Sequence, residues 1–221
     1  MKIKSTSDME NTGVKVLVYA QAGAGKTTLI SSLADCIVLS AEGGLLSLSK
    51  YNIPYIEITD METLEEAYQW FSNSTEASQF KSVALDSISE IAEVVLAAEK
   101  AKSRDPRAAY GNMQDIMTGY IRKFRDLSER HVYFSAKMEK VQDEMGRIMY
   151  GPSMPGAKMG QLLPYYFDEV LALRVEHNED SETVRMLQTE GDGTWLAKDR
   201  SGKLEKWEDP DLSSIINRIL S

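Results

Sequence analysis

The chain has 221 residues, 43% of them hydrophobic and 27% charged, and its 25 basic and 34 acidic residues give a net charge of −9. This acidic balance argues against a protein that coats DNA at all times, because nonspecific affinity for DNA comes mostly from basic residues. No apolar run approaches the roughly 20 residues that span a membrane, and the N-terminus lacks the apolar core of a signal peptide, so we expect a cytoplasmic protein. The single cysteine, Cys36, excludes an internal disulfide, and with two histidines it gives no zinc signature.

We expect an N-terminal arm over residues 1–13 and one domain over residues 14–221. The domain opens with Val14–Tyr19, a short apolar run typical of a buried strand. A loop of small residues, Ala20–Thr27, follows, and Thr28–Leu33 resumes a helical pattern with its apolar residues on one side. Strand, small-residue turn and helix are the context that a phosphate-binding loop, or P-loop, requires.

The loop reads A-x-x-x-x-G-K-T, with alanine where the usual pattern has its first glycine. Gly23 and Gly25 let backbone N–H groups approach a phosphate closely, and the following helix adds its free N–H groups. Lys26 is expected to reach the β- and γ-phosphates of a nucleotide, and the Thr27 hydroxyl to ligate Mg²⁺. The flanking strand and helix disfavour the alternative, a chance Gly-Lys-Thr in a surface turn. The predicted nucleotide-binding residues are Ala22, Gly23, Ala24, Gly25, Lys26, Thr27 and Thr28.

Strand and helix patterns alternate through residue 135. Further strands are expected at Cys36–Ser40, Tyr55–Ile58, Ser82–Leu85, His131–Ser135, Glu169–Val175, Thr183–Gln188 and Trp195–Asp199. Helices are expected from Thr63, over Ile88–Ala101, Met113–Arg130 and Asp211–Leu220, and irregular segments at residues 99–112 and 137–160. This order predicts an α/β fold with a mostly parallel central sheet, helices on both faces, and antiparallel strands added after residue 168.

Two carboxylates follow predicted strands. Asp86 closes the apolar run SVALD, where a P-loop protein places the acid that holds the water shell of Mg²⁺. The alternative role, a cap on the next helix, is weaker given the P-loop upstream. Glu42 follows the second strand in LSAEGG, where it could orient or deprotonate the water that attacks the γ-phosphate. From the residues alone, a solvated loop carboxylate accounts for Glu42 equally well.

Lys198 and Arg200 stand two residues apart in WLAKDRSGKL, so on a strand they share one face. Bare sequence favours a hairpin with ordinary surface charges. The functional alternative is a pair of cations offered to the γ-phosphate of a neighbouring subunit, as an arginine finger is.

Six segments in order resemble the core of RecA/Rad-type recombinases, and more closely the small phage nucleotide-binding proteins described as RecA-like single-strand annealing proteins. They are AGAGKTT, VLSAEGGL, VALDS, HVYFSAK, GPSMPGAKMGQLLPYYFDEVLAL and WLAKDR. The similarity spans residues 14–206, and the order and spacing of the segments are more specific than the common P-loop and VALDS alone. The resemblance implies a RecA-like P-loop NTPase fold, ATP and Mg²⁺ as ligands, and DNA-stimulated ATP hydrolysis in phage DNA recombination.

The resemblance also implies roles for residues. Lys26 and Thr27 match the phosphate and Mg²⁺ ligands, and Asp86 matches the metal-binding acid. Glu42 matches the catalytic base, and Lys198 and Arg200 match the paired cations that reach across a subunit interface. Segments 99–112 and 138–160 fall where recombinases keep two DNA-binding loops; they carry Lys100, Lys102, Arg104, Arg107, Lys140, Arg147, Tyr150 and Lys158. The expected partners are single-stranded DNA, further copies of the chain with ATP at subunit interfaces, and a single-strand binding protein, with no membrane.

The chain also departs from the recombinase pattern. Lys137 follows the fifth strand, where recombinases often carry a glutamine that senses the γ-phosphate, and no Phe-x-x-Ala tether is found. Whether copies of the chain would form a ring or a filament is therefore left open. Two other functions stay open as well. The acidic balance suits a regulatory ATPase that acts on a protein partner, whereas a nucleotide or small-molecule kinase would need several lid arginines, and segment 137–160 has only Arg147.

Overall fold

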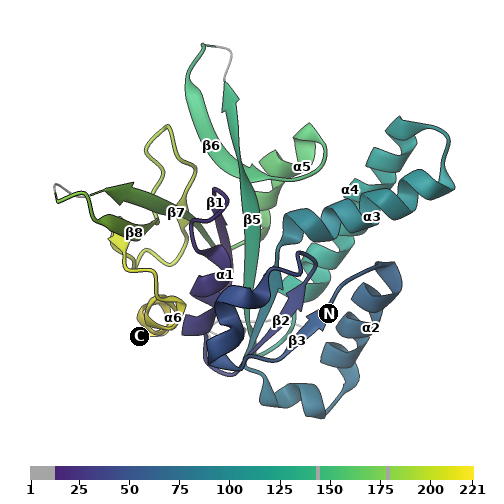
Figure 1. Ribbon diagram of the computed structural model, residues 1–221, viewed down its shortest axis with the longest axis horizontal. Coiled ribbons are helices and arrows are strands. Elements are labelled where there is room, and N and C mark those ends of the chain that lie inside the picture. Colours follow the sequence, from purple (N-terminus) through teal and green to yellow (C-terminus); the bar gives the residue numbers. More distant parts are fainter. Residues whose placement is uncertain (1–12, 143–144, 178–179) are drawn as a thin grey trace, which may run out of the picture.

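The structure, a computed structural model, describes residues 13–142, 145–177 and 180–221, so all but the last residue of the expected arm lies outside it. Within these residues one sheet has ten strands in the order β10-β8-β7-β1-β5-β4-β2-β3, with β6 beside β5 and β9 beside β7 (Figure 1). The strands are β1 (Lys15–Ala20), β2 (Cys36–Ser40), β3 (Tyr55–Glu57), β4 (Ser82–Asp86), β5 (His131–Gln142), β6 (Ile148–Ser153), β7 (Glu169–His177), β8 (Thr183–Gln188), β9 (Lys198–Asp199) and β10 (Trp207–Glu208).

The strands from β3 through β2, β4, β5 and β1 to β7 run parallel, and β6, β8, β9 and β10 are antiparallel additions. The predicted architecture is thereby confirmed. Strand β1 shows why the sheet forms: Leu17 and Tyr19 enter the core on one face, and Val16 and Val18 enter it on the other. A strand that is apolar on both faces is stable only in the middle of a sheet covered on both sides.

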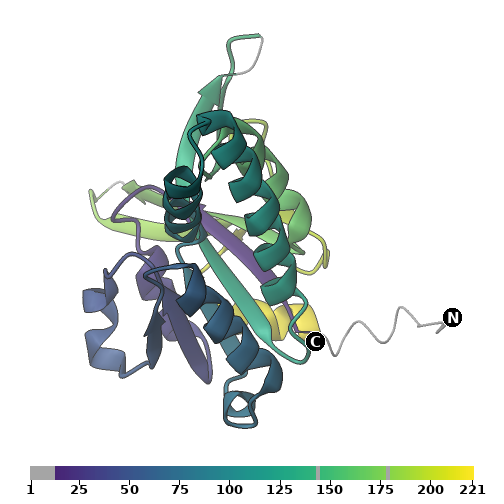
Figure 2. The same cartoon turned by 90° about the vertical axis from the view of Figure 1, so that its right-hand side faces the viewer.

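Helices cover both faces. Helices α2 (Met61–Asn73), α3 (Ile88–Lys102), α4 (Pro106–Arg125) and α5 (Ala157–Leu162), with the 3₁₀ turns η4 (Glu76–Gln79) and η5 (Leu163–Tyr166), cover one face (Figure 2). Helices α1 (Lys26–Leu29) and α6 (Leu212–Leu220), with the 3₁₀ turns η2 (Ile30–Ser32) and η3 (Leu45–Tyr51), cover the other. None of the helices formed by the described residues is long and apolar enough to cross a membrane.

The prediction of an irregular loop over residues 99–112 is wrong. Helix α3 continues to Lys102 and α4 starts at Pro106, which leaves only a short turn between them. The Asp105 side chain accepts a hydrogen bond from Arg107 N (2.9 Å), and Pro106 occupies the first turn. Proline suits a first helical position because its missing N–H group would be unpaired there anyway. It therefore starts α4, which ends at Arg125 rather than Arg130.

The prediction of an irregular segment over residues 137–160 is also wrong. Strand β5 continues past Ser135 to Gln142 and pairs with β6, from Lys137 opposite Ser153 to Gln142 opposite Ile148. This hairpin projects from the sheet (Figure 1), so its residues lack the apolar alternation that marks a half-buried strand. Its glycines and prolines suggested a loop, yet Gly151 and Pro152 lie within β6.

The C-terminal strand predicted over Trp195–Asp199 is reduced to Lys198–Asp199, and Arg200 lies beyond it. Trp195 instead forms an isolated bridge with Tyr150. The predicted strand Thr183–Gln188 is confirmed as β8. The final helix begins after Asp211, whose carboxylate accepts from Ser214 N at 2.9 Å.

Candidate functional site

Residues 20–25 link β1 to α1 and curl around the Lys26 side chain. Gly23 (φ 76°) and Gly25 (φ 109°) adopt left-handed backbone conformations that favour glycine. Lys26 Nζ donates to the carbonyl oxygens of Ala20 and Gln21, each at 3.2 Å. Ala20 keeps its place at the end of β1, so alanine serves where the usual pattern has glycine.

A cavity of about 520 Å³ opens over this loop. Cavities of this size hold small-molecule ligands and cofactors. Its walls include six of the seven nucleotide-binding residues predicted from the sequence; Ala24 is buried beneath. The lining residues are Ala20, Gln21, Ala22, Gly23, Gly25, Lys26, Thr27, Thr28, Glu42, Ser47, Lys137 and Met138.

Asp86 lies at the carboxyl end of β4, separated from β1 by β5. Its carboxylate is 2% exposed and accepts two hydroxyl hydrogen bonds, from Thr27 Oγ1 (2.7 Å) and from Ser135 Oγ. Burial raises the pKa of this carboxyl, and the two hydroxyls act in the opposite direction. The peptide bond that follows, Asp86–Ser87, is cis.

Thr27 and Asp86 form an oxygen pair of the kind that holds Mg²⁺ beside a nucleotide in P-loop proteins. The described residues include no cluster of three or more His, Cys, Asp or Glu side chains that could hold a metal by themselves. The hydroxyl of Thr27 and the carboxylate of Asp86 fit Mg²⁺, which is commonly bound through one or two protein oxygens together with substrate phosphates and water. Thr27 and Asp86 would hold the ion, and the ion would neutralise charge on the β- and γ-phosphates.

Glu42 follows β2, the strand next to β4, so the two carboxylates come from neighbouring strand ends. Its carboxylate is exposed on the cavity wall and accepts a hydrogen bond from Ser87 Oγ. Ser87 also caps α3 by accepting from Glu90 N at 3.3 Å. Glu42 is thereby oriented from the start of α3, where it can align a water molecule against the γ-phosphate position.

The site also holds two lysines. Burial lowers the pKa of Lys26, whereas Glu42 and Asp86 act to raise it. Lys137 lines the cavity from β5, and its Nζ forms an ion pair with Glu90 of α3. Lys137 therefore lines the same cavity as Lys26, with its charge partly satisfied by Glu90.

Lys198 and Arg200 lie away from this cavity within the chain. Strand β9 pairs with Glu169 and Val170 at the start of β7, the end of the sheet opposite the P-loop. Lys198 Nζ donates to the carbonyls of Pro164 (2.8 Å) and Phe167 (2.6 Å). Arg200, which is exposed, pairs with Asp168 at 2.9 Å. The two cations thus do not share a strand face, and Lys198 stabilises its own chain.

Seven of the eight predicted DNA-binding residues lie on two projections rather than two loops, and Lys158 lies on α5. Lys102 pairs with the buried Glu99 (2.7 Å), and Lys100 lies over the ring of Tyr110. Tyr150 stacks on Trp195 with ring centroids 4.4 Å apart, so it does not stand free to stack on a base. The remaining five are exposed: Arg104, Arg107, Lys140, Arg147 and Lys158.

Two serines belong to the site although sequence reasoning did not select them. Ser135 ends the predicted strand HVYFS, and only its position at a strand end could have indicated its contact with Asp86. Ser89 Oγ donates to Ser153 O (2.7 Å) and accepts from Lys137 N (2.9 Å), a link that joins three elements distant in sequence.

The P-loop, the strand-end acid one strand away, and the parallel sheet define a RecA-like P-loop nucleoside triphosphatase. The chain belongs to the AAA domain family, whose model matches residues 12–201. Among solved structures, a KaiC-like protein from the hyperthermophilic archaeon Pyrococcus horikoshii OT3 is 13% identical, with 80% of this chain and 77% of that chain covered and a TM-score of 0.41. No curated protein matches the sequence.

Proposed function

We propose that this protein is a Mg²⁺-dependent ATPase whose nucleotide cycle controls the binding of single-stranded DNA, and that it anneals strands in phage DNA recombination. The observation that carries the proposal is that two hairpins project from the sheet, and that both begin beside the candidate nucleotide site. The helical arm is the α3–α4 hairpin, residues 88–125, and the strand arm is the β5–β6 hairpin, described over residues 137–142 and 145–153. The strand arm starts at the cavity wall, the helical arm starts directly after Ser87, which contacts Glu42 on that wall, and both extend beyond the sheet (Figure 1).

Hydrogen bonds join the two arms at the cavity. Ser87 contacts Glu42 and caps α3, so the helical arm begins at the residue that orients the expected catalytic base. Two residues further, Ser89 ties α3 to both strands of the strand arm through Lys137 N and Ser153 O. The Lys137–Glu90 ion pair adds a second tie. A phosphate that binds at the γ-phosphate position would therefore act on the residues from which both arms start.

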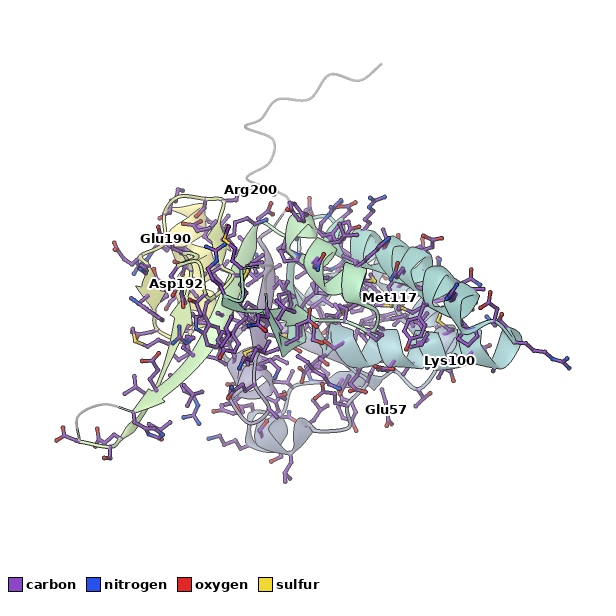
Figure 3. The ribbon with its side chains drawn as sticks, turned by 90° about the horizontal axis from the view of Figure 1, so that it is seen from above. Glu57, Lys100, Met117, Glu190, Asp192 and Arg200 are labelled. Carbon is purple, nitrogen blue, oxygen red and sulfur yellow. The ribbon has the colours of Figure 1, made fainter. Side chains whose placement is uncertain are left out.

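The arms carry the charges that a DNA strand needs. The turn of the helical arm exposes Arg104 and Arg107, and Lys100 stands near the end of α3 (Figure 3). The strand arm exposes Lys140 and Arg147. In a chain with a net charge of −9, these local cations would make DNA binding weak and strongly dependent on salt.

Within the cavity, each residue has a distinct part. Lys26 and the backbone N–H groups of the loop hold the phosphates, and Thr27 and Asp86 hold the metal ion. Glu42 orients the attacking water and takes its proton, while the two lysines offset negative charge near the γ-phosphate. The fold supplies this arrangement from the carboxyl ends of β1, β2 and β4.

The deciding experiment measures ATP hydrolysis with no DNA, with a single-stranded oligonucleotide, and with a duplex of equal length. We expect the single strand to raise turnover and the duplex to leave it unchanged. Annealing of two labelled complementary strands should accelerate with ATP. Lys26→Ala serves as the control: it should stay folded and lose both hydrolysis and the effect of ATP on annealing. ATP hydrolysis without any response to single-stranded DNA, and no binding at low salt, would contradict the DNA role.

The strand arm also supports a second candidate, an ATPase that acts on a protein partner. It exposes three apolar side chains, Val141 (40%), Met145 (81%) and Ile148 (41%), which suit a protein surface better than a phosphate backbone. This candidate predicts ATP hydrolysis that ignores DNA, with Val141→Ser/Ile148→Ser leaving the basal rate unchanged and abolishing stimulation by the partner.

A further inference from the structure

The reactive groups of the cavity all approach the P-loop from one flank. Glu42 follows β2, and Asp86 and Lys137 belong to β4 and β5; these three strands lie on the same side of β1 in the sheet. The γ-phosphate must face this flank, because the groups that act on it are there. A nucleotide is elongated, so its nucleoside end must point toward the other flank of β1, where β7 and β8 lie.

On that second flank, Arg185 of β8 reaches the P-loop. Its Nε donates to the carbonyl oxygen of Ala24 at 3.0 Å, across 161 residues of sequence. Its Nε and Cδ would lie 3.6 and 3.7 Å from a Cβ placed on Gly25, so the side chain lies against the loop itself. The residue is exposed, so its guanidinium remains accessible to a ligand.

The position of Arg185 is set by rigid packing. Arg185 pairs with Val175 across β7 and β8. The neighbouring cross-strand pair, Leu173 and Leu187, is buried in the same apolar cluster as Ala24 and Leu29. Strand β8 is therefore fixed against the P-loop and α1, and the guanidinium is held beside the loop before any ligand arrives.

We propose that Arg185 is a positioning residue that binds the nucleoside half of ATP, with its planar guanidinium against the base. Arginine suits this task because its plane stacks on aromatic rings while its N–H groups hydrogen-bond. Here Nε is already committed to the loop carbonyl, which fixes the plane of the group. The proposal rests on the assignment of the cavity as the ATP site and extends it to the end of the nucleotide that the P-loop motif does not specify.

The test compares three ligands by calorimetry: ATP, ADP and inorganic tripolyphosphate, which lacks the nucleoside. For Arg185→Ala we expect ATP and ADP to bind about tenfold more weakly, as the loss of one desolvated cation–π contact would cause, and tripolyphosphate to bind as in the wild type. The Michaelis constant for ATP should rise with little change in turnover number. Arg125→Ala, which removes one positive charge at the far end of α4, should leave all three affinities unchanged.

Three outcomes would overturn the proposal. Equal weakening of tripolyphosphate and ATP would mean that Arg185 only maintains the shape of the loop. Unchanged affinity for ATP and ADP would mean that the nucleoside lies elsewhere. A wild-type protein that binds tripolyphosphate but not ATP would also refute the role of Arg185, whereas one that binds none of the three would refute the nucleotide site itself.

Discussion

Glu42 is held at the cavity by the hydroxyl of Ser87, and its carboxylate is otherwise open to the site. Glu42→Gln keeps the shape of the side chain and an oxygen that can accept from Ser87, but it removes the base. We expect ATP to bind with unchanged affinity and hydrolysis to slow at least roughly tenfold, as for the loss of a general base. Calorimetry and phosphate release measure the two quantities, with the exposed Glu57→Gln as control. A loss of ATP affinity would instead show that Glu42 binds the nucleotide or its metal ion.

Glu169 is a second carboxylate with an unusual environment, opposite Asp199 across β7 and β9. It is 1% exposed and its Oε2 has no hydrogen-bond partner. Burial, and then the Asp199 charge, raise the pKa of Glu169 from 4.5 to about 8. The unfolded chain releases this proton at lower pH than the folded chain does, so the free energy of unfolding should fall as pH rises from 4.5 to about 8.

Glu169→Gln removes this titration and keeps the shape of the side chain, with an amide N–H group that can donate to Asp199. We expect it to raise the free energy of unfolding at pH 8 by about 4 kcal/mol, from roughly 1.4 kcal/mol for each pKa unit between 4.5 and about 8, and to change it little at pH 4. Urea unfolding across this range measures the effect. Parallel pH profiles for the two proteins would show that Glu169 is already ionised in the fold.

For single residues, the sequence predicts the members of the motifs but not the side chains that contact them from distant parts of the chain. Lys26, Thr27 and Asp86 follow from local sequence, because a strand, a turn and a strand end fix each of them. Ser135 and Arg185 act through contacts with residues 49 and 161 positions away. No local pattern marks such residues, since their neighbours are set by the strand order of the sheet.

The two arms carry the next prediction. Lys100→Ala/Arg104→Ala/Arg107→Ala removes three cations from the helical arm, whereas Lys102 is already paired with Glu99. Since each phosphate contact on a single strand contributes about 0.7 to the salt dependence, the slope of log affinity against log salt should fall by about 2. Fluorescence anisotropy with a labelled oligonucleotide measures it. Lys81→Ala/Lys203→Ala/Lys206→Ala, with the same loss of charge at exposed positions away from the arms, should keep the wild-type slope; an equal slope in both variants would place the DNA path elsewhere.

The elements themselves show why the arms were predicted as loops. The buried strands of the sheet were recognised because their apolar runs are continuous. The sequence predicts a break in the helical arm around Pro106, but a proline favours the start of a helix as much as its end. The strand arm extends from the sheet, so Lys137, Glu139 and Lys140 on β5 face mostly solvent or polar neighbours. The alternation of apolar residues marks a strand only where one face is buried, and a hairpin that projects from the sheet buries few of its side chains.

For the whole molecule, the position of β9 decides how Arg200 could take part in catalysis. The P-loop follows the carboxyl end of β1, whereas β9 pairs beside the amino end of β7, so the sheet separates them within one chain. Figure 3 places Arg200 at the edge of the molecule, free of the core. If Arg200 acts on ATP at all, it must act on the ATP of a neighbouring copy. Lys198 is less suited to this role because Pro164 and Phe167 occupy its ammonium group.

A mixing experiment tests this arrangement. Lys26→Ala cannot use ATP but still offers Arg200, and Arg200→Ala has an intact P-loop but offers no cation. Each alone should be nearly inactive, and the activity of the wild type per subunit should rise with protein concentration as oligomers form. In an equal mixture, about a quarter of the head-to-tail interfaces would combine an intact P-loop with an intact Arg200, so about a quarter of the wild-type rate should return. Asp168→Asn, which frees Arg200 from its ion pair, should retain activity and serve as the control for local disruption. No recovery in a mixture shown to co-assemble would return Arg200 to the role of an ordinary surface charge.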